Sequence, residues 1–196
     1  MLDLKVPLVG GADHGYSEAV YLEDLESNGI ELNRDKPVNE WDIREDGRIV
    51  GVTEELSAQE IYEMGRKVEP FVIAKDTRMG HIHLSVQDSQ LSSAFYQEVL
   101  ELTDKFTIPS ASWIASGDYH HHLAVNEWGG KDLAKREEDM SGLANYVVEV
   151  EDKGDLIAMA ERANNRGAEV KWLSSNALTF EDNDGILTRV RKNINN

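Results

Sequence analysis

Residues 79–128 constrain the fold most, because a strand pattern, a helix pattern and two more strand patterns follow one another there. The opening MGHIHLSV alternates apolar and polar residues, which is typical of a strand with His81 and His83 on one face. Five of the six histidines of the chain lie in this stretch. A single strand histidine is usually structural, whereas this clustering raises the prospect of a binding or metal site.

The helix pattern consists of Leu91, Phe95 and Val99 at a spacing of four, which predicts one apolar stripe. Asp88 or Ser89 is the expected N-cap, since short polar side chains accept hydrogen bonds from the first backbone N–H groups. The helix therefore lies between the first strand and the final pair of strands.

The last strand pattern of this stretch carries three consecutive histidines. Because side chains alternate between the two faces of a strand, we expect His120 and His122 to share a face. His121 is expected to point to the opposite side as a structural or interfacial residue.

Composition excludes several classes of function. The chain has 196 residues, 40% of them hydrophobic, so it can bury a core as one large domain or as one domain with an appendage. There is no apolar run of about 18 residues for a membrane span, and the N-terminus lacks the features of a secretory signal. The absence of cysteine favours the cytoplasm and excludes thiolate metal sites. A net charge of −17 argues against nucleic-acid binding.

The first 35 residues predict a hairpin. SEAVYL (17–22) alternates as a strand, a turn-rich segment follows, and GIELNRD reads as the second strand. A hairpin of this size is marginal alone, so residues 1–35 must pack on the rest of the chain or on another chain.

Residues 36–78 form a linker with one helix. The range 48–52 could add a short strand. Ser57 and Glu60 form an S-x-x-E capping box at the helix start, and Gly65 is placed to end it.

A second module begins at Gly142. GLANYVVEVED resembles GHIHLSVQD, so that Asp152 matches Asp88, and a helix ending near Gly167 follows. Three further strand patterns complete the chain. The sequence therefore predicts an internal duplication over 79–130 and 142–196.

The motifs GHIHLSV, AFYQEVL, YHHHLAVNEW and ADHGYSEAVYLEDLESNGIELNRD together resemble the vicinal oxygen chelate superfamily, in its catechol 2,3-dioxygenase-like branch. The resemblance implies an α+β fold of βαβββ modules paired into a half-barrel, complete over 79–196. Residues 1–35 then look like the end of a first domain, and most of that domain does not precede them. We expect either a shortened product or one segment of a longer assembly.

For the first-domain segment, the resemblance implies that Glu31 is a metal ligand. His14 and Tyr21 match the family's acid/base and oxygen-orienting residues. The implied reaction is ring cleavage of a catechol-type substrate with Fe(II) or Mn(II). The two histidine ligands of that site are not in this segment, so activity of the chain alone is doubtful, and a solvent-facing Glu31 is the competing interpretation.

For the complete domain, the resemblance implies His81 and His122 as ligands from the leading module. The trailing module carries Asn145 and Arg189 where a histidine and a glutamate are expected. A guanidinium beside a dication is unfavourable, so we expect no standard iron site. A weaker site of His81, His83, His120 and His122 is one alternative. Binding of an anionic or phenolic ligand by Arg189 and the histidines is another.

Two functions follow as hypotheses. The first is a protein derived from an extradiol dioxygenase, acting on a small aromatic substrate as a homo-oligomer or with a complementing chain. The second is a non-catalytic module for small aromatic or anionic ligands, similar to bleomycin-resistance proteins. A glyoxalase-type isomerase is disfavoured by Asn145 and Arg189.

Overall fold

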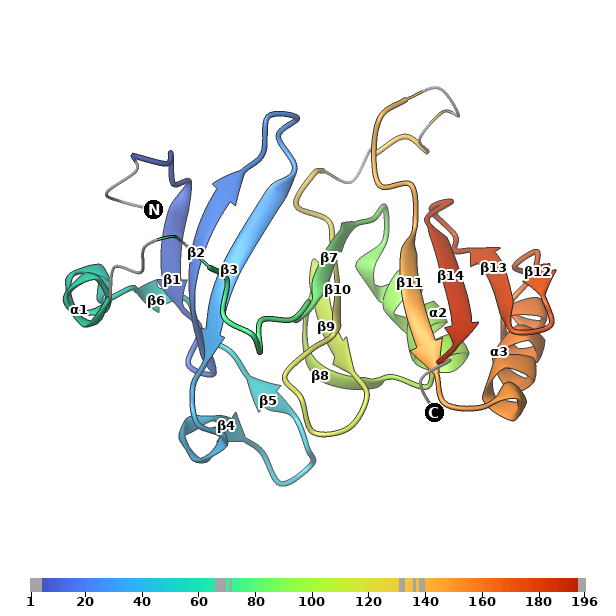
Figure 1. Cartoon of the computed structure of the whole chain (residues 1–196). Helices are drawn as coiled ribbons and strands as arrows, with labels where there is room; N and C mark the ends of the chain where they lie inside the picture. The colour runs from blue at the N-terminus through green and yellow to red at the C-terminus, as the bar shows by residue number, and fades with distance from the viewer. Residues whose placement is uncertain are drawn as a thin grey trace. The chain divides into compact units, whose positions relative to one another are not determined.

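The computed structural model describes residues 5–65, 70, 72–130, 133–135, 137 and 140–193. Contacts divide the chain into two compact units, Met1–Gly80 and His81–Asn196, whose elements are labelled in Figure 1. Among the residues that the structure describes, none of the helices has the length and apolar character that a membrane crossing requires.

Unit 1 is built on a four-stranded antiparallel sheet in the order β3-β2-β1-β6. Its strands are β1 (Gly10–Asp13), β2 (Ser17–Glu23), β3 (Gly29–Asp35) and β6 (Glu54–Glu55). The predicted hairpin is confirmed as β2 and β3, which pair over their full length. The hairpin pairs with β1, and β1 pairs with β6, which comes from the predicted linker. The hairpin therefore packs on the rest of its own unit.

The remaining elements of unit 1 are short. They are the 3-10 helix η2 (Val38–Glu40), the paired strands β4 (Asp42–Ile43) and β5 (Ile49–Val50), and the helix α1 (Ala58–Met64). The strand and the helix expected in the linker are therefore confirmed as β5 and α1.

The predicted capping box of α1 is wrong. Ser57 makes no side-chain hydrogen bond to the helix and has ψ of 61°, outside the extended region that N-cap residues adopt. Without that backbone geometry the hydroxyl is not aimed at the first N–H groups. The sequence motif alone could not show this.

In unit 2 the first module contains β7 (Ile82–Ser85), α2 (Ser89–Leu100), β8 (Thr103–Ile108), β9 (Ala111–Ala115) and β10 (Leu123–Asn126). Its sheet has the order β7-β10-β9-β8, and β10 runs parallel to β7. The order places the first and last strands of the module side by side, with β7 at the edge of the sheet.

The second module repeats this arrangement with β11 (Tyr146–Val150), α3 (Lys153–Asn165), β12 (Lys171–Ser174), β13 (Ala177–Glu181) and β14 (Leu187–Lys192). Its sheet order, β11-β14-β13-β12, is the same. The predicted α+β architecture of paired βαβββ modules is confirmed.

Both module helices begin at the predicted aspartates. Asp88 accepts hydrogen bonds from the backbone N–H groups of Gln90 and Leu91. Asp152 forms a capping box with Asp155. These caps satisfy the first N–H groups of each helix, which otherwise have no partner within the helix.

The apolar stripe of α2 differs from the predicted one. Leu91 is 50% exposed, whereas Phe95 and Val99 are buried together with Ser92 and Tyr96. A helix turns about 100° per residue, so a strict spacing of four drifts around the axis. The buried face therefore follows steps of three and four, and Leu91 falls at its edge.

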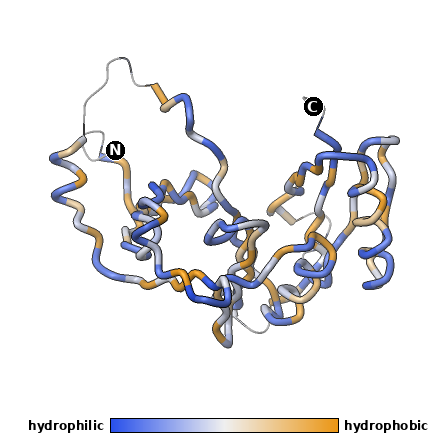
Figure 2. Tube along the Cα trace, turned by 90° about the horizontal axis from the view of Figure 1, so that it is seen from below, coloured by the Kyte–Doolittle hydropathy of each residue, from blue (hydrophilic) through white to orange (hydrophobic). Residues whose placement is uncertain are grey.

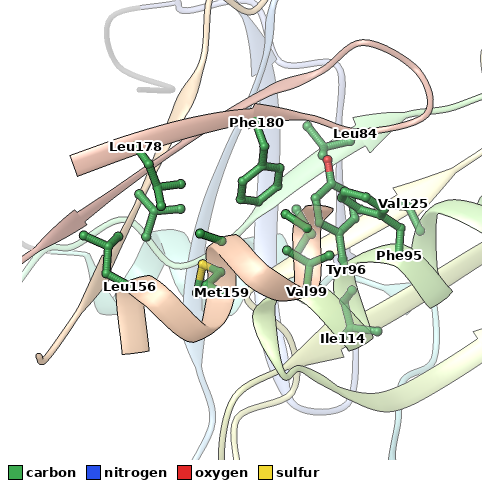
Figure 3. Packing of buried hydrophobic residues seen from close by; sticks show 14 of the residues in the cluster. Leu84, Phe95, Tyr96, Val99, Ile114, Val125, Leu156, Met159, Leu178 and Phe180 are labelled. Carbon is green, nitrogen blue, oxygen red and sulfur yellow. The ribbon is translucent and has the colours of Figure 1, made fainter. Parts of the chain in front are cut away.

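One apolar core serves both modules. Figure 3 shows Val99 of α2 beside Met159 of α3, and the rings of Phe95 and Phe180 lie 6.0 Å apart. The helix faces opposite the core are mostly polar, with Leu91 and Ile157 as exposed apolar residues, and hydrophobic and hydrophilic segments alternate along the trace in Figure 2. The helices pack on the core face of the sheets, so the second face of each sheet is available for function.

A buried hydrogen bond joins the modules across this core. The Tyr96 hydroxyl donates to Asp182 Oδ2 at 2.6 Å, and Asp182 Oδ1 accepts from the backbone N–H groups of Asp184 and Ile186 at 2.9 and 2.8 Å. Burial raises the pKa of Asp182, and the hydrogen bond from Tyr96 opposes that rise. The carboxylate is therefore stable inside the core only with these donors in place.

We predict that Tyr96→Phe lowers the free energy of unfolding by about 1–3 kcal/mol near neutral pH, because it removes a donor from a buried carboxylate. A raised folded-state pKa means that Asp182 favours folding most when protonated, and that this contribution is lost as pH rises through the folded pKa. The loss in Tyr96→Phe should therefore shrink in acid. Urea unfolding of Tyr96→Phe, Asp182→Asn and the double variant measures the coupling energy between the two side chains. If the two losses of unfolding free energy simply add in the double variant, the hydrogen bond does not contribute to stability.

Candidate functional site

His14 lies between β1 and β2, and both of its ring nitrogens are hydrogen-bonded. Nδ1 lies 2.9 Å from the carbonyl oxygen of Val52, and Nε2 lies 2.5 Å from the hydroxyl of Tyr21. A carbonyl oxygen can only accept, so Nδ1 carries the proton and Nε2 accepts from Tyr21. The fold therefore fixes one tautomer of His14 and makes Nε2 its basic atom.

Tyr21 faces Glu31 across the β2–β3 pair. Burial, and then the negative charge of Glu31, raise the pKa of Tyr21 to about 12. Tyr21 is therefore protonated at neutral pH and can donate its hydrogen bond to His14. The structure brings together His14, Tyr21 and Glu31, the three residues that the family resemblance singled out within residues 1–35.

An aromatic neighbour completes this cluster. The ring of Tyr16 stacks on His14 with centroids 6.2 Å apart, and Trp41 packs edge-on against Tyr16. A Cβ at Gly51 would lie 2.8 Å from Tyr16 Cε1, so glycine is needed there for this packing. No sequence pattern points to Tyr16, because its contacts with Trp41 and Gly51 depend on the fold of the linker.

The first cluster does not by itself supply a metal site. A catalytic divalent metal takes about three protein ligands, and both nitrogens of His14 already have hydrogen-bond partners. Among the described residues of unit 1, no three histidine or acidic ligand atoms gather within reach of one ion. Glu31 is thus at most one ligand of a larger set.

A second cluster of chemistry-bearing side chains lies in unit 2. One ligand nitrogen from each of His81, His83 and His121 lies within 4.8 Å of the others. The ring centroids of His81 and His121 are 4.2 Å apart, and that of His83 is 5.3 and 5.4 Å from theirs. His121 is buried, His81 is half-buried and His83 is exposed. Three imidazoles in this arrangement fit a divalent transition metal with open positions toward solvent.

The placement of the triple histidine in a strand is wrong. His120, His121 and His122 lie in the loop before β10, which begins at Leu123. The backbone there is fixed by hydrogen bonds from His122 N to Ile114 O and from Ile82 N to His122 O. Alternation therefore does not apply, and His121 points to His81 rather than away from the cluster.

His120 and His122 lie outside the cluster of three. His120 is buried and its Nδ1 lies 2.7 Å from Nδ1 of His121. His122 is exposed, and its Nδ1 accepts a hydrogen bond from the backbone N–H of Ser116. Of the four-histidine alternative, the structure brings together His81 and His83, and it adds His121. Gly117, at φ +66°, marks the turn that could have signalled this loop.

Asn145 and Arg189 occupy related positions in the second module. Asn145 precedes β11 as His81 precedes β7, and both Asn145 and Arg189 are exposed. Thr188 pairs with Tyr146 in the second module as Leu123 pairs with Ile82 in the first. Arg189 is therefore equivalent to Ala124 of the first module, and not to His122.

An aromatic surface lies beside the histidine cluster. Strand register places His83, Ala124, Trp113 and Phe106 in one row across the sheet. The ring of Trp128, which is 62% exposed, lies 6.0 Å from His83 and 6.2 Å from Trp113. This row lines the face of the sheet opposite the core, since the neighbouring Leu84, Val125 and Ile114 are core residues.

We predict that Glu31→Gln lowers the pKa of Tyr21, because it removes the negative charge that opposes tyrosinate formation. NMR of ring-labelled tyrosine, over the alkaline range in which the fold persists, measures this change. Glu23→Gln, which changes an exposed glutamate on the strand of Tyr21, is the matched control. An unchanged Tyr21 titration in Glu31→Gln would show that the two groups do not interact.

Comparisons with known proteins place the chain in a family. The model of the Glyoxalase/Bleomycin resistance protein/Dioxygenase superfamily matches residues 78–190. The chain is 32% identical over 165 residues to "Catechol-2,3-dioxygenase" of Bacillus subtilis (strain 168), covering 83% of this chain and 58% of the relative. It therefore spans little more than half the length of that protein.

Chains similar to this one are found among solved structures. A putative glyoxalase from Bacillus halodurans has a TM-score of 0.50 at 14% identity, over 60% of this chain and 97% of the other. A glyoxylase/bleomycin resistance protein/dioxygenase domain from Frankia sp. EAN1pec is 25% identical with a TM-score of 0.47, over 59% of this chain and 97% of the other. With the matched residues and the paired modules together, the chain belongs to the glyoxalase/bleomycin resistance protein/dioxygenase superfamily.

Proposed function

We propose that this chain takes part in extradiol cleavage of a catechol-type substrate and that unit 1 supplies its proton-accepting pair. The observation that carries the proposal is the hydrogen bond from Tyr21 to His14 Nε2, with Glu31 opposite Tyr21. The 32% identity to a protein named catechol-2,3-dioxygenase, over most of this chain, supports it.

The pair can take a proton from a substrate hydroxyl. The hydroxyl donates to the Tyr21 oxygen as the Tyr21 proton passes to His14 Nε2, which leaves a catecholate and an imidazolium. The Nδ1–H of that imidazolium donates to the carbonyl oxygen of Val52, which stabilises the positive charge. Because Glu31 disfavours a tyrosinate, Tyr21 relays the proton and does not hold the negative charge.

Ring opening by O₂ requires a metal, which the family resemblance implies to be Fe(II) or Mn(II). We propose Glu31 as its carboxylate ligand. The described residues of unit 1 do not provide the other ligands, so unit 1 alone would not hold the metal. A homo-oligomer or a complementing chain is the proposed source of the rest of the site.

A second candidate function is binding of a small aromatic or anionic ligand without catalysis. The aromatic surface of unit 2, made of the exposed Trp128 and the half-buried Trp113 and Phe106, favours it, because aromatic faces stack on planar ligands. The exposed guanidinium of Arg189 offers a cation for an anionic ligand on the second module.

We predict that Tyr21→Phe lowers turnover of catechol by about 100-fold or more, because it breaks the proton path to His14. Oxygen uptake in the presence of Fe(II) or Mn(II) measures turnover. Titration with 4-nitrocatechol, whose absorption spectrum reports its ionisation, measures proton removal without turnover. Tyr62→Phe, on the exposed α1, is the matched control.

Equal ionisation of bound 4-nitrocatechol by Tyr21→Phe and Tyr62→Phe would contradict the proton-accepting pair. Thermal stabilisation by catechols that survives Tyr21→Phe and disappears in Trp128→Ala would favour the binding module.

A further inference from the structure

We infer that His81, His83 and His121 form a binding site for a divalent transition metal, separate from Glu31 and independent of the proposed function. One ligand nitrogen from each residue lies within 4.8 Å of the others. The cluster combines the start of β7 with the loop before β10, two segments far apart in the sequence.

The backbone holds these two segments in place. Parallel pairing of β7 and β10, extended by the hydrogen bond from Ile82 N to His122 O, fixes the spacing between His81 and His121. His83 lies on β7 itself, on the face opposite the buried Leu84. Backbone hydrogen-bonded beside the paired strands therefore carries His81 and His121, and β7 carries His83, which limits the rearrangement needed to bind an ion.

His120 positions His121. With 2.7 Å between the two Nδ1 atoms, one must donate to the other. If His121 donates, its Nδ1 carries the proton and Nε2 becomes the coordinating nitrogen. Metal-binding histidines usually donate their second N–H to a carboxylate, a backbone carbonyl or a water, and here the ring of His120 would be the acceptor. His120 is 1% exposed and its ring packs against Tyr119 with centroids 4.0 Å apart, so its own orientation is fixed.

The donor set selects the class of metal. Three imidazoles favour zinc, nickel, copper, cobalt or Fe(II), and disfavour magnesium and calcium, which prefer oxygen ligands. Neutral imidazoles leave the charge of the ion uncompensated, so an open position on the side of the exposed His83 favours an anion or hydroxide. The net charge of −17 on the chain also favours cation binding.

The test is zinc binding by isothermal titration calorimetry on the full chain after removal of metals with a chelator. We expect one site in the wild type, and a larger loss of affinity in His81→Ala, His83→Ala or His121→Ala than in any variant of His120. His122→Ala is the matched control, an adjacent histidine outside the cluster. His83 is exposed, so His83→Ala tests the site without disturbing the core.

His120 is tested by rescue. His120→Phe keeps a ring but removes the acceptor for His121 Nδ1–H, and should lower zinc affinity about 10- to 100-fold. His120→Asn offers a side-chain oxygen as the acceptor and should restore much of that affinity. Equal affinities in the two variants would show that His120 acts only through packing.

Tryptophan fluorescence supplies an independent readout of position. Cobalt should quench Trp128, whose ring lies 6.0 Å from His83, and Trp128→Phe should reduce the quenching without abolishing cobalt binding. Absence of zinc binding in the wild type, or an equal loss in His122→Ala and His121→Ala, would overturn the site. Unchanged zinc binding in Glu31→Gln is expected, so this site and the proposed function can fail separately.

Discussion

The parallel pairing of β7 with β10 is the constraint on which unit 2 depends. It brings the two ends of the first module together, and α2 packs on one face of the resulting sheet. On the other face it aligns His83 with Ala124 and Trp113, and at its end it places His81 beside His121. The core and the candidate metal site thus both depend on the pairing of β7 with β10, so a change that shifts the register of this pair would alter both.

The second module repeats the architecture without the chemistry. Its first and last strands pair in the same way, yet Asn145 stands where His81 stands in the first module, and Arg189 stands at the position of Ala124. The modules are joined by apolar packing, which has little directional preference, and by the Tyr96–Asp182 hydrogen bond, which has a strong one. The bond therefore specifies how two similar halves fit together.

Periodicity and capping predicted most of the elements, because the signals of Asp88 and Asp152 are local to their helices. The signal at Ser57 failed because a cap also requires backbone geometry that the residue type does not determine. In unit 1 the grouping of His14, Tyr21 and Glu31 followed from family resemblance, and the structure brings these residues together. His121 could not be placed from sequence, since strand alternation was extended into a loop whose path depends on contacts with Ile114 and Ile82.

The two clusters differ in what they can do. His14 and Tyr21 are arranged to move a proton, whereas His81, His83 and His121 are arranged to hold an ion. X-ray absorption spectroscopy of the zinc-loaded chain tests the ion site most directly. The account predicts imidazole nitrogens at about 2.0–2.1 Å from zinc, three in the wild type and two in His121→Ala. A first shell dominated by carboxylate oxygens, or a histidine count that His121→Ala does not change, would contradict it.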